Sequence, residues 1–272
     1  MILFPNSKIN LGLHILRKRN DGFHDLETVF YPIPLSDALE IIEAENIRAE
    51  TTITTSGRAI DGNVEENICI KAYKLLQKEF DIPPVKIHLH KAIPIGAGLG
   101  GGSADGAFTL LLLNKKFKLD IAEEKLMEYG LQLGSDCPFF IKNKISYATG
   151  RGEIIKQINL DLSPYKIALI NPGIKINTGL AFSQIHPKEN RTSILEIIQE
   201  PIDGWKDNLV NDFEKPIFKQ HPAIKEIKKE LYEKGAVYAC MSGSGSSVFG
   251  LFEKSTAPAL DLPGDYFMQW IT

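Results

Sequence analysis

A glycine-rich segment is the part of the sequence best suited to chemistry. Five of the seven residues from Gly96 to Gly102 are glycine, and Ser103 follows them. The segment lies between an alternating pattern typical of a strand and an apolar stretch with helical spacing. Glycine lets a backbone approach a ligand closely, and the free N–H groups of such a loop can surround an anion at the positive end of a helix dipole. We therefore expect this segment to bind a phosphate group.

Three other interpretations of this glycine-rich segment are a Walker A loop, a dinucleotide-binding fingerprint and a flexible linker. A Walker A loop is excluded because the segment holds no lysine. Gly96, Gly98 and Gly101 match a dinucleotide fingerprint, which also needs a strand ending in an acidic residue about 20 positions further on. Asp120 is followed instead by a helix-like pattern. A flexible linker is disfavoured by the apolar flanks, so a dinucleotide-binding oxidoreductase is the alternative that stays open.

Composition sets the class of protein. The chain has 272 residues, with 31 Lys and Arg against 34 Asp and Glu and a hydrophobic share of 43%, which is ordinary globular usage and excludes disorder and collagen. A net charge of −3 disfavours a nucleic-acid partner. Three distant cysteines favour neither a disulfide framework nor a zinc site. The apolar run 110–113 is far too short to cross a membrane, so we expect a soluble cytoplasmic protein.

Periodicity indicates the elements that must position the glycine segment. Apolar and polar residues alternate from Lys8 to Ile15, which predicts a strand with Lys8 and Asn10 on its polar face. Further strands are expected at 39–42, 51–55, 85–90 and 166–170, and a last pair on either side of 242–247. Helices are expected from 67 to about 80, at 104–117, 121–132, from 135, and at about 177–185, 193–199, 207–219 and 222–234. A domain boundary is expected near residue 150.

Three motifs resemble those of the GHMP kinases, the superfamily of galactokinase, homoserine kinase and mevalonate kinase. The segment 94–105 is similar to their phosphate loop, 5–13 to their first motif and 241–250 to their third, in the expected order. The resemblance implies a two-domain α+β fold with the active site in the inter-domain cleft. An ATP-binding domain would span 1–150 and a substrate-binding domain 151–272, and the last few residues are candidates for a return to the first domain.

Two further stretches, 17–30 and 134–140, are similar to the branch of this family that phosphorylates a cytidine diphosphate sugar alcohol in isoprenoid precursor synthesis. A sister activity of the homoserine or mevalonate kinase type is the close alternative. A nucleotide-binding regulator that has lost catalysis is a third interpretation. The presence of both Lys8 and Asp136, which match the catalytic pair of the family, counts against a regulator.

The resemblance implies a role for each member of that pair. A carboxylate such as Asp136 can take the proton of the attacking hydroxyl. An ammonium such as Lys8 can polarise that hydroxyl and offset the charge that gathers on the transferring phosphoryl group. Taken alone, Asp136 would be a helix cap and Lys8 a solvated residue on a strand.

The resemblance also implies the residues that hold the two substrates. Phe23 and His24 would stack on and hydrogen-bond the cytosine, although the family more often has Tyr at the first position, and the other substrate residues would be Asn10, Thr178 and Phe182. ATP would contact Pro94, Ile95, Gly96, Ala97, Gly98, Leu99, Gly100, Gly101, Gly102, Ser103 and Ala104, with Asn67 and Lys91 on the adenine side. A helix cap and a strand-end charge are the other interpretations of Asn67 and Lys91. Mg²⁺ is expected to arrive with ATP, helped by Ser103, and the sequence indicates no metal ligand of its own.

Overall fold

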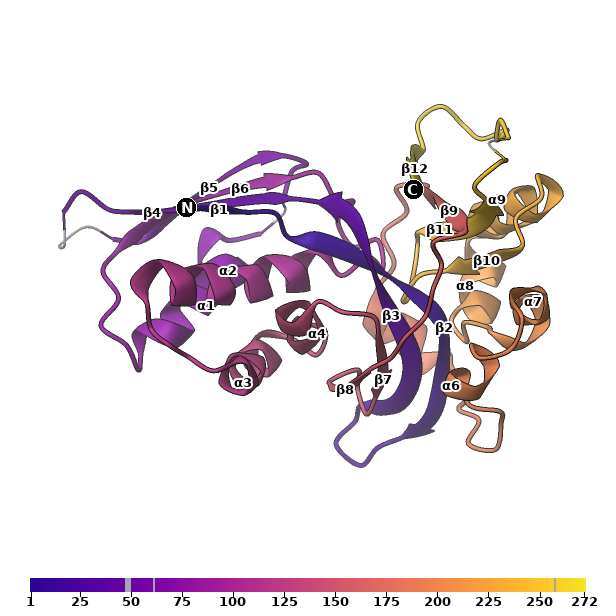
Figure 1. Cartoon of the computed structure of the whole chain (residues 1–272), viewed down its shortest axis with the longest axis horizontal. Coiled ribbons are helices and arrows are strands. Elements are labelled where there is room, and N and C mark those ends of the chain that lie inside the picture. The colour runs from indigo at the N-terminus through magenta and orange to yellow at the C-terminus, as the bar shows by residue number, and fades with distance from the viewer. Residues whose placement is uncertain (47–49, 61, 257) are drawn as a thin grey trace. The chain divides into compact units, whose positions relative to one another are not determined.

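The computed structural model describes residues 1–46, 50–60, 62–256 and 258–272. The chain divides into two compact units, which Figure 1 shows with their helices and strands labelled. Unit 1 comprises Met1–Ser7, Pro34–Ile95 and Gly100–Lys144. Unit 2 comprises Lys8–Ile33, Gly96–Leu99 and Ile145–Thr272. Each unit has its own sheet and helices.

Unit 1 is a sheet with helices on one face (Figure 1). Its described strands have the order β1-β4-β6-β5, with β5 parallel to β6 and the other pairs antiparallel. A short 3₁₀ turn at Val64–Glu66 precedes the first helix. The elements of the unit are β1 (Ile2–Leu3), β4 (Ala38–Glu43), β5 (Thr52–Gly57), α1 (Ile68–Gln77), β6 (Val85–Lys91), α2 (Gly101–Phe117), α3 (Glu123–Leu133) and α4 (Cys137–Lys142).

Helix α2 is the central helix of unit 1. Its buried residues are small or aliphatic, among them Ala104, Ala107 and Leu110, so the helix can approach its neighbours closely. A Cβ at Gly106 would lie 2.8 Å from Cγ1 of Ile68 in α1, a distance that real side chains do not tolerate. Glycine at this position therefore allows α1 and α2 to pack against each other.

Unit 2 has two described sheets, with the orders β2-β3-β7-β8 and β10-β11-β9-β12. Strands β2 and β3 begin or end in unit 1. A second 3₁₀ turn, Ile202–Gly204, precedes α7. The elements are β2 (Asn6–Lys18), β3 (His24–Ser36), β7 (Ser146–Thr149), β8 (Ile154–Gln157), β9 (Tyr165–Asn171), α5 (Thr178–Ser183), α6 (Ile194–Ile197), α7 (Trp205–Asn208), α8 (Glu214–Gln220), α9 (Pro222–Glu233), β10 (Tyr238–Met241), β11 (Val248–Glu253) and β12 (Phe267–Ile271).

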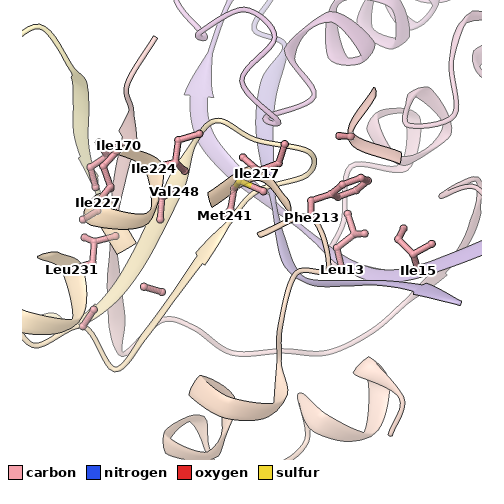
Figure 2. Close-up of a cluster of buried hydrophobic side chains, with 14 of the residues drawn as sticks. Leu13, Ile15, Ile170, Phe213, Ile217, Ile224, Ile227, Leu231, Met241 and Val248 are labelled. Atoms are coloured by element: carbon pink, nitrogen blue, oxygen red, sulfur yellow. The ribbon is translucent and has the colours of Figure 1, made fainter. Parts of the chain in front are cut away.

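A hydrophobic core joins the strands of unit 2 to its C-terminal helices. Side chains from β2, β9, β10 and β11 meet those of α8 and α9, as Figure 2 shows for Leu13, Ile170, Ile217, Ile227 and Met241. Burial of each such side chain is worth roughly 1.5–3 kcal/mol. This core fixes β2, the strand that carries Lys8 and Asn10.

The units differ from the predicted division at residue 150. Residues 8–33 group with 145–272 because β3 pairs with β7 and β7 with β8. Residues 96–99 belong to the same unit, where Ser247 N–H donates to Ala97 O. The final strand, β12, pairs with β9, so it lies in the second unit and does not return to the first. Sequence periodicity also missed β3, which is buried at most positions and so lacks the alternation of a half-exposed strand.

The predicted helix at 207–219 is two helices, α7 and α8. Between them the chain bonds to β2, where Leu13 N–H donates to Val210 O at 2.9 Å and Asp212 N–H donates to Leu13 O at 2.9 Å. These backbone groups are therefore unavailable to a continuous helix. Most other predicted strands and helices are confirmed within a few residues at each end. In the described part of the chain, no helix is both long and apolar enough to span a bilayer.

Candidate active site

The first half of the glycine segment packs against the turn between β10 and β11. Gly98 has a φ of +77°, and a Cβ there would lie 2.0 Å from the carbonyl oxygen of Ser242. The Ser242 hydroxyl donates to Gly98 O at 2.8 Å, and Ser247 N–H donates to Ala97 O at 3.1 Å. The glycine is thus required by both its backbone conformation and this close approach, and the two motifs form one packed structure within unit 2.

Lys8 lies beside this packed pair of loops. Its backbone N–H donates to Leu99 O at 3.0 Å. Its ammonium donates to Asn10 Oδ1 at 2.6 Å and to Gly98 O at 3.3 Å, and it lies 5.0 Å from the ring centroid of Phe30. Carbonyl oxygens and an aromatic face attract an ammonium without cancelling its charge. The predicted residues Lys8, Asn10 and Gly98 are therefore brought together.

The second half of the glycine segment begins α2. Gly96, Gly98 and Gly100 all have φ between +64° and +77°, the left-handed region that favours glycine, and Gly100 is the N-cap of the helix. A Cβ on Gly102 would meet no atom within 4 Å. Because the first N–H groups of a helix have no partner within it, the start of α2 offers donors and open space to an anion.

Asp136 is the N-cap residue of α4, in unit 1. Among the described residues its side chain makes no capping hydrogen bond to that helix. Pro138 stands in the first turn, where a missing N–H costs nothing. The predicted helix start is confirmed, but the carboxylate is not occupied in capping it. Asp136 and Lys8 belong to different units, so their pairing stays a prediction.

The predicted adenine-side residues both have structural partners in unit 1. Asn67 caps α1, with its Oδ1 accepting the N–H of Cys69 at 2.9 Å. Lys91 is buried, where its ammonium pairs with Asp37 and with Asp105, the latter at 2.6 Å. Lys91 is thus a charge at the end of strand β6, as one interpretation predicted, and it belongs to a buried ion cluster. The adenine contacts of both residues stay predictions.

Two predicted cytosine-binding side chains lie against each other in unit 2. The rings of His24 and Phe182 stack with centroids 5.0 Å apart and planes at 17°. Phe182 also meets Phe213 edge-on at 4.8 Å, so the core fixes its position. Burial, followed by the charge of Lys18, lowers the pKa of His24. The imidazole is therefore neutral near pH 7, with one donor and one acceptor nitrogen.

Two further predicted substrate residues, Phe23 and Thr178, are exposed on unit 2, whereas the predicted substrate residue Asn10 is buried. The ring of Phe23 is 50% exposed, and the guanidinium of Arg151 lies 4.4 Å from its centroid. Thr178 begins α5, four residues before Phe182, so both lie on one face of that helix. The Thr178 hydroxyl lies 3.0 Å from that of Ser244. Both hydroxyls thus border the turn that contains Ser242.

Sequence patterns did not indicate two residues that hold these parts in place. The side chain of Asn211 donates to Met241 O at 2.7 Å and to Gly243 O at 2.8 Å. The hydroxyl of Thr28 donates to Gly12 O at 2.5 Å and accepts from Asn10 Nδ2 at 3.0 Å. Each connects segments that are distant in sequence, so no local spacing could have identified it.

No resident metal site is apparent in the described ranges. Among those residues, no three His, Cys, Asp or Glu side chains lie close enough together to hold an ion. Ser103, in the first turn of α2, has a hydroxyl that hydrogen-bonds the Cys137 thiol, whose pKa burial raises to about 12.

Comparison with known proteins assigns the family. The GHMP kinases N terminal domain matches residues 67–144, and the GHMP kinases C terminal domain matches 195–260. A 4-diphosphocytidyl-2-C-methyl-D-erythritol kinase of Bacteroides fragilis (strain YCH46) is 57% identical over 252 residues, which cover 93% of this chain and 92% of that protein. One of the same name from Porphyromonas gingivalis is 46% identical and covers 96% of this chain and 94% of that protein.

Solved structures give the same result. A crystal structure of 4-(cytidine 5'-diphospho)-2C-methyl-D-erythritol kinase has a TM-score of 0.79 at 28% identity, covering 100% of this chain and 99% of that one. The mevalonate kinase of Methanococcus jannaschii, at 15% identity and a TM-score of 0.67 over 94% of this chain and 91% of that one, shares the fold. The chain therefore belongs to the GHMP kinases and, within them, to the family of 4-diphosphocytidyl-2-C-methyl-D-erythritol kinases.

Proposed function

We propose that the chain transfers the γ-phosphoryl group of ATP to the 2-hydroxyl of 4-diphosphocytidyl-2-C-methyl-D-erythritol. The observation that carries the proposal is the 57% identity to a kinase of that name over nearly the whole of both chains. Lys8 and Asp136 occupy the positions of the catalytic pair in this family. The chain also has the sequence motifs that resemble the family's phosphate loop, at 94–105, and its cytidine-specific branch, at 17–30.

Asp136 takes the proton of the substrate hydroxyl as the oxygen attacks phosphorus. A carboxylate within hydrogen-bond reach of the hydroxyl suits this role, and Asp136 places one at the start of α4. Lys8 polarises the hydroxyl and stabilises the negative charge of the transferring group. The carbonyl oxygens of Asn10 and Gly98 hold the ammonium in position. Catalysis of phosphoryl transfer depends mainly on such positioning and on charge stabilisation.

The glycine segment binds the phosphates of ATP. The positive φ angles at Gly96, Gly98 and Gly100 turn the backbone, and the free N–H groups at the start of α2 receive the anion. The open space at Gly102 leaves room for a phosphate oxygen. The hydroxyl of Ser103 would be the protein group that helps to hold the Mg²⁺ bound with ATP, and that ion would supply charge neutralisation at the phosphates.

The cytidine group binds at the aromatic residues of unit 2. A base inserted between two aromatic rings would need those rings to be about 7 Å apart, because it stacks on both of them. The ring centroids of His24 and Phe182 are only 5.0 Å apart, so no base fits between them. His24 therefore meets the edge of cytosine, where its neutral imidazole can donate and accept hydrogen bonds. The exposed ring of Phe23 provides a stacking face, and Phe182 supports His24.

Purified protein incubated with Mg²⁺-ATP and a panel of alcohols tests the proposal. The panel contains 4-diphosphocytidyl-2-C-methyl-D-erythritol, homoserine and mevalonate, and ADP release is followed. We expect turnover with the cytidine compound alone. Faster turnover of homoserine or mevalonate would replace the proposal with a sister activity, and reduction of a nicotinamide cofactor would favour the oxidoreductase alternative.

A further inference from the structure

We propose that Thr28 is a positioning residue for this phosphoryl transfer, because it fixes the amide of Asn10 so that the amide oxygen faces Lys8. The inference rests on the proposed function. Thr28 lies in β3, and Asn10 and Lys8 lie in β2. All the hydrogen bonds that carry the argument lie within unit 2.

The proton of the Thr28 hydroxyl has one available place. A hydroxyl has a single proton, and a backbone carbonyl can only accept. Because Gly12 O lies 2.5 Å from Oγ1 of Thr28, the proton is donated there. The same oxygen can then only accept a hydrogen bond from Asn10, at 3.0 Å. The side of the Asn10 amide that faces Thr28 must therefore be its NH₂ group.

This orientation determines what Lys8 meets. With the NH₂ group toward Thr28, Oδ1 of Asn10 lies 2.6 Å from the Lys8 ammonium. An ammonium has donors and no acceptor, so the opposite orientation would set N–H against N–H. The amide can satisfy both neighbours in one orientation, and the Thr28 hydroxyl selects it.

Neighbouring hydrogen bonds hold the backbone of Asn10 and the Lys8 ammonium in place. The backbone N–H of Asn10 donates to Ser242 Oγ at 3.2 Å, and that hydroxyl donates to Gly98 O at 2.8 Å. Gly98 O also accepts from Lys8 at 3.3 Å. Asn10 and Thr28 are 1% and 0% exposed, so water cannot readily replace a partner that is lost.

Thr28→Val tests the inference because valine has nearly the same shape and lacks the hydroxyl. Without the Thr28 hydroxyl, the Asn10 amide is no longer held with Oδ1 toward the Lys8 ammonium. We expect kcat to fall about 10- to 100-fold, the range for losing that hydrogen bond to a charged group. The KM for ATP should stay within about 2-fold, because the change acts through Lys8. Thr28→Ser keeps the hydroxyl and should restore most of kcat. If Thr28→Val does not fold, Thr28→Ala is the replacement.

Two controls separate positioning from loss of stability. Thr109 is equally buried and donates to the backbone O of Asp105 at 2.7 Å, so Thr109→Val loses a comparable hydrogen bond and should leave kcat unchanged. In an Asn10→Ala background, Thr28→Val should cause no further loss, since residues that act as one unit are not additive. Equal kcat for the two valine variants, or independent effects of Thr28 and Asn10, would overturn the inference.

Exchange of the Asn10 side-chain amide protons, measured by NMR, tests the orientation without reference to activity. In the unmodified chain one of these protons is held by Thr28 and should exchange slowly. Thr28→Val should accelerate its exchange at least 10-fold, and an unchanged rate would overturn the inference. This measurement needs no substrate, so it tests the orientation of the Asn10 amide even if the proposed function is wrong. The proposed function is tested separately, by the activity of the unmodified chain.

Discussion

Asp136 illustrates how one residue pattern fits two roles. Ser135, Asp136 and Pro138 have the composition of a helix start, and α4 does begin there. Among the described residues, however, the carboxylate of Asp136 makes no capping hydrogen bond. Helix propensity explains why the chain turns at this point, and it does not explain why the residue is an aspartate. The proposed catalytic role would provide that reason.

Asp136→Asn should lower kcat by about 10²- to 10⁴-fold, the range for losing a general base, because an amide cannot take the proton of the hydroxyl. Affinity for ATP should change little. Steady-state kinetics and calorimetry with ATP check both expectations. Turnover close to that of the unmodified chain would remove Asp136 from the mechanism.

Phe23→Ala should raise the KM for the cytidine substrate about 5- to 150-fold, which corresponds to losing one base stack of about 1–3 kcal/mol. The KM for ATP should be unaffected. Phe4 is similarly exposed but lies in unit 1, so Phe4→Ala is the matched control and should leave both constants unchanged. A KM for the cytidine substrate that is equal in the two variants would rule out stacking on Phe23.

At the scale of elements, the start of α2 combines a conformational requirement with open space. The glycines at 96, 98 and 100 have positive φ, which explains them without any ligand. Gly102 has neither a positive φ nor a neighbour that a Cβ would meet. Alanine is normally preferred to glycine within a helix by roughly 0.5–1 kcal/mol, and the proposed phosphate contact would account for glycine at this position.

Gly102→Ala should therefore preserve or raise the Tm and raise the KM for ATP by about 10- to 100-fold, which corresponds to about 1.4–2.8 kcal/mol of binding lost when the new methyl group weakens a hydrogen bond to a phosphate. Thermal unfolding and kinetics check the two parts separately. Gly264 also has open space around it and no positive φ, and Gly264→Ala should leave the KM for ATP unchanged. An unaltered KM in Gly102→Ala would show that phosphate does not approach this residue.

The ion cluster between β6 and α2 should make the stability of unit 1 depend on pH. Burial raises the pKa of Asp105 to about 7, despite the opposing charge of Lys91. The ordinary pKa of an aspartate is about 3.9, so the folded protein binds this proton more tightly than the unfolded chain. The resulting stabilisation is complete below about pH 4 and is lost as the pH rises to about 7.

Asp105→Asn should flatten this dependence, because its side chain is neutral at every pH. Thermal unfolding between pH 5 and 8 is the measurement. The Tm of the unmodified chain should fall across this range relative to that of the variant. Parallel curves for the two proteins would show that Asp105 does not hold a proton in the folded state.

At the scale of the whole molecule, the sequence predicts the parts of the fold that depend on local pattern. Strand β6 alternates because one of its faces is buried, whereas β2 alternates in residue type although both of its faces are buried from Ser7 to Ile15. The glycine segment is recognisable because few other residues adopt its φ angles. Long-range pairing is not visible in this way. Strand β3 lacks alternation, the region around Asn211 bonds to β2, and Thr28 acts through Asn10, so these features required the structure.

The measurement that tests the central claim most directly is the structure of the reaction product. Incubation with Mg²⁺-ATP and 4-diphosphocytidyl-2-C-methyl-D-erythritol, followed by ³¹P and ¹H NMR, locates the transferred phosphoryl group. We expect a phosphomonoester on the 2-hydroxyl, formed in equal amount with ADP, and inhibition of the reaction by CMP and CDP. ADP release without this product, or a product phosphorylated at another hydroxyl, would contradict it.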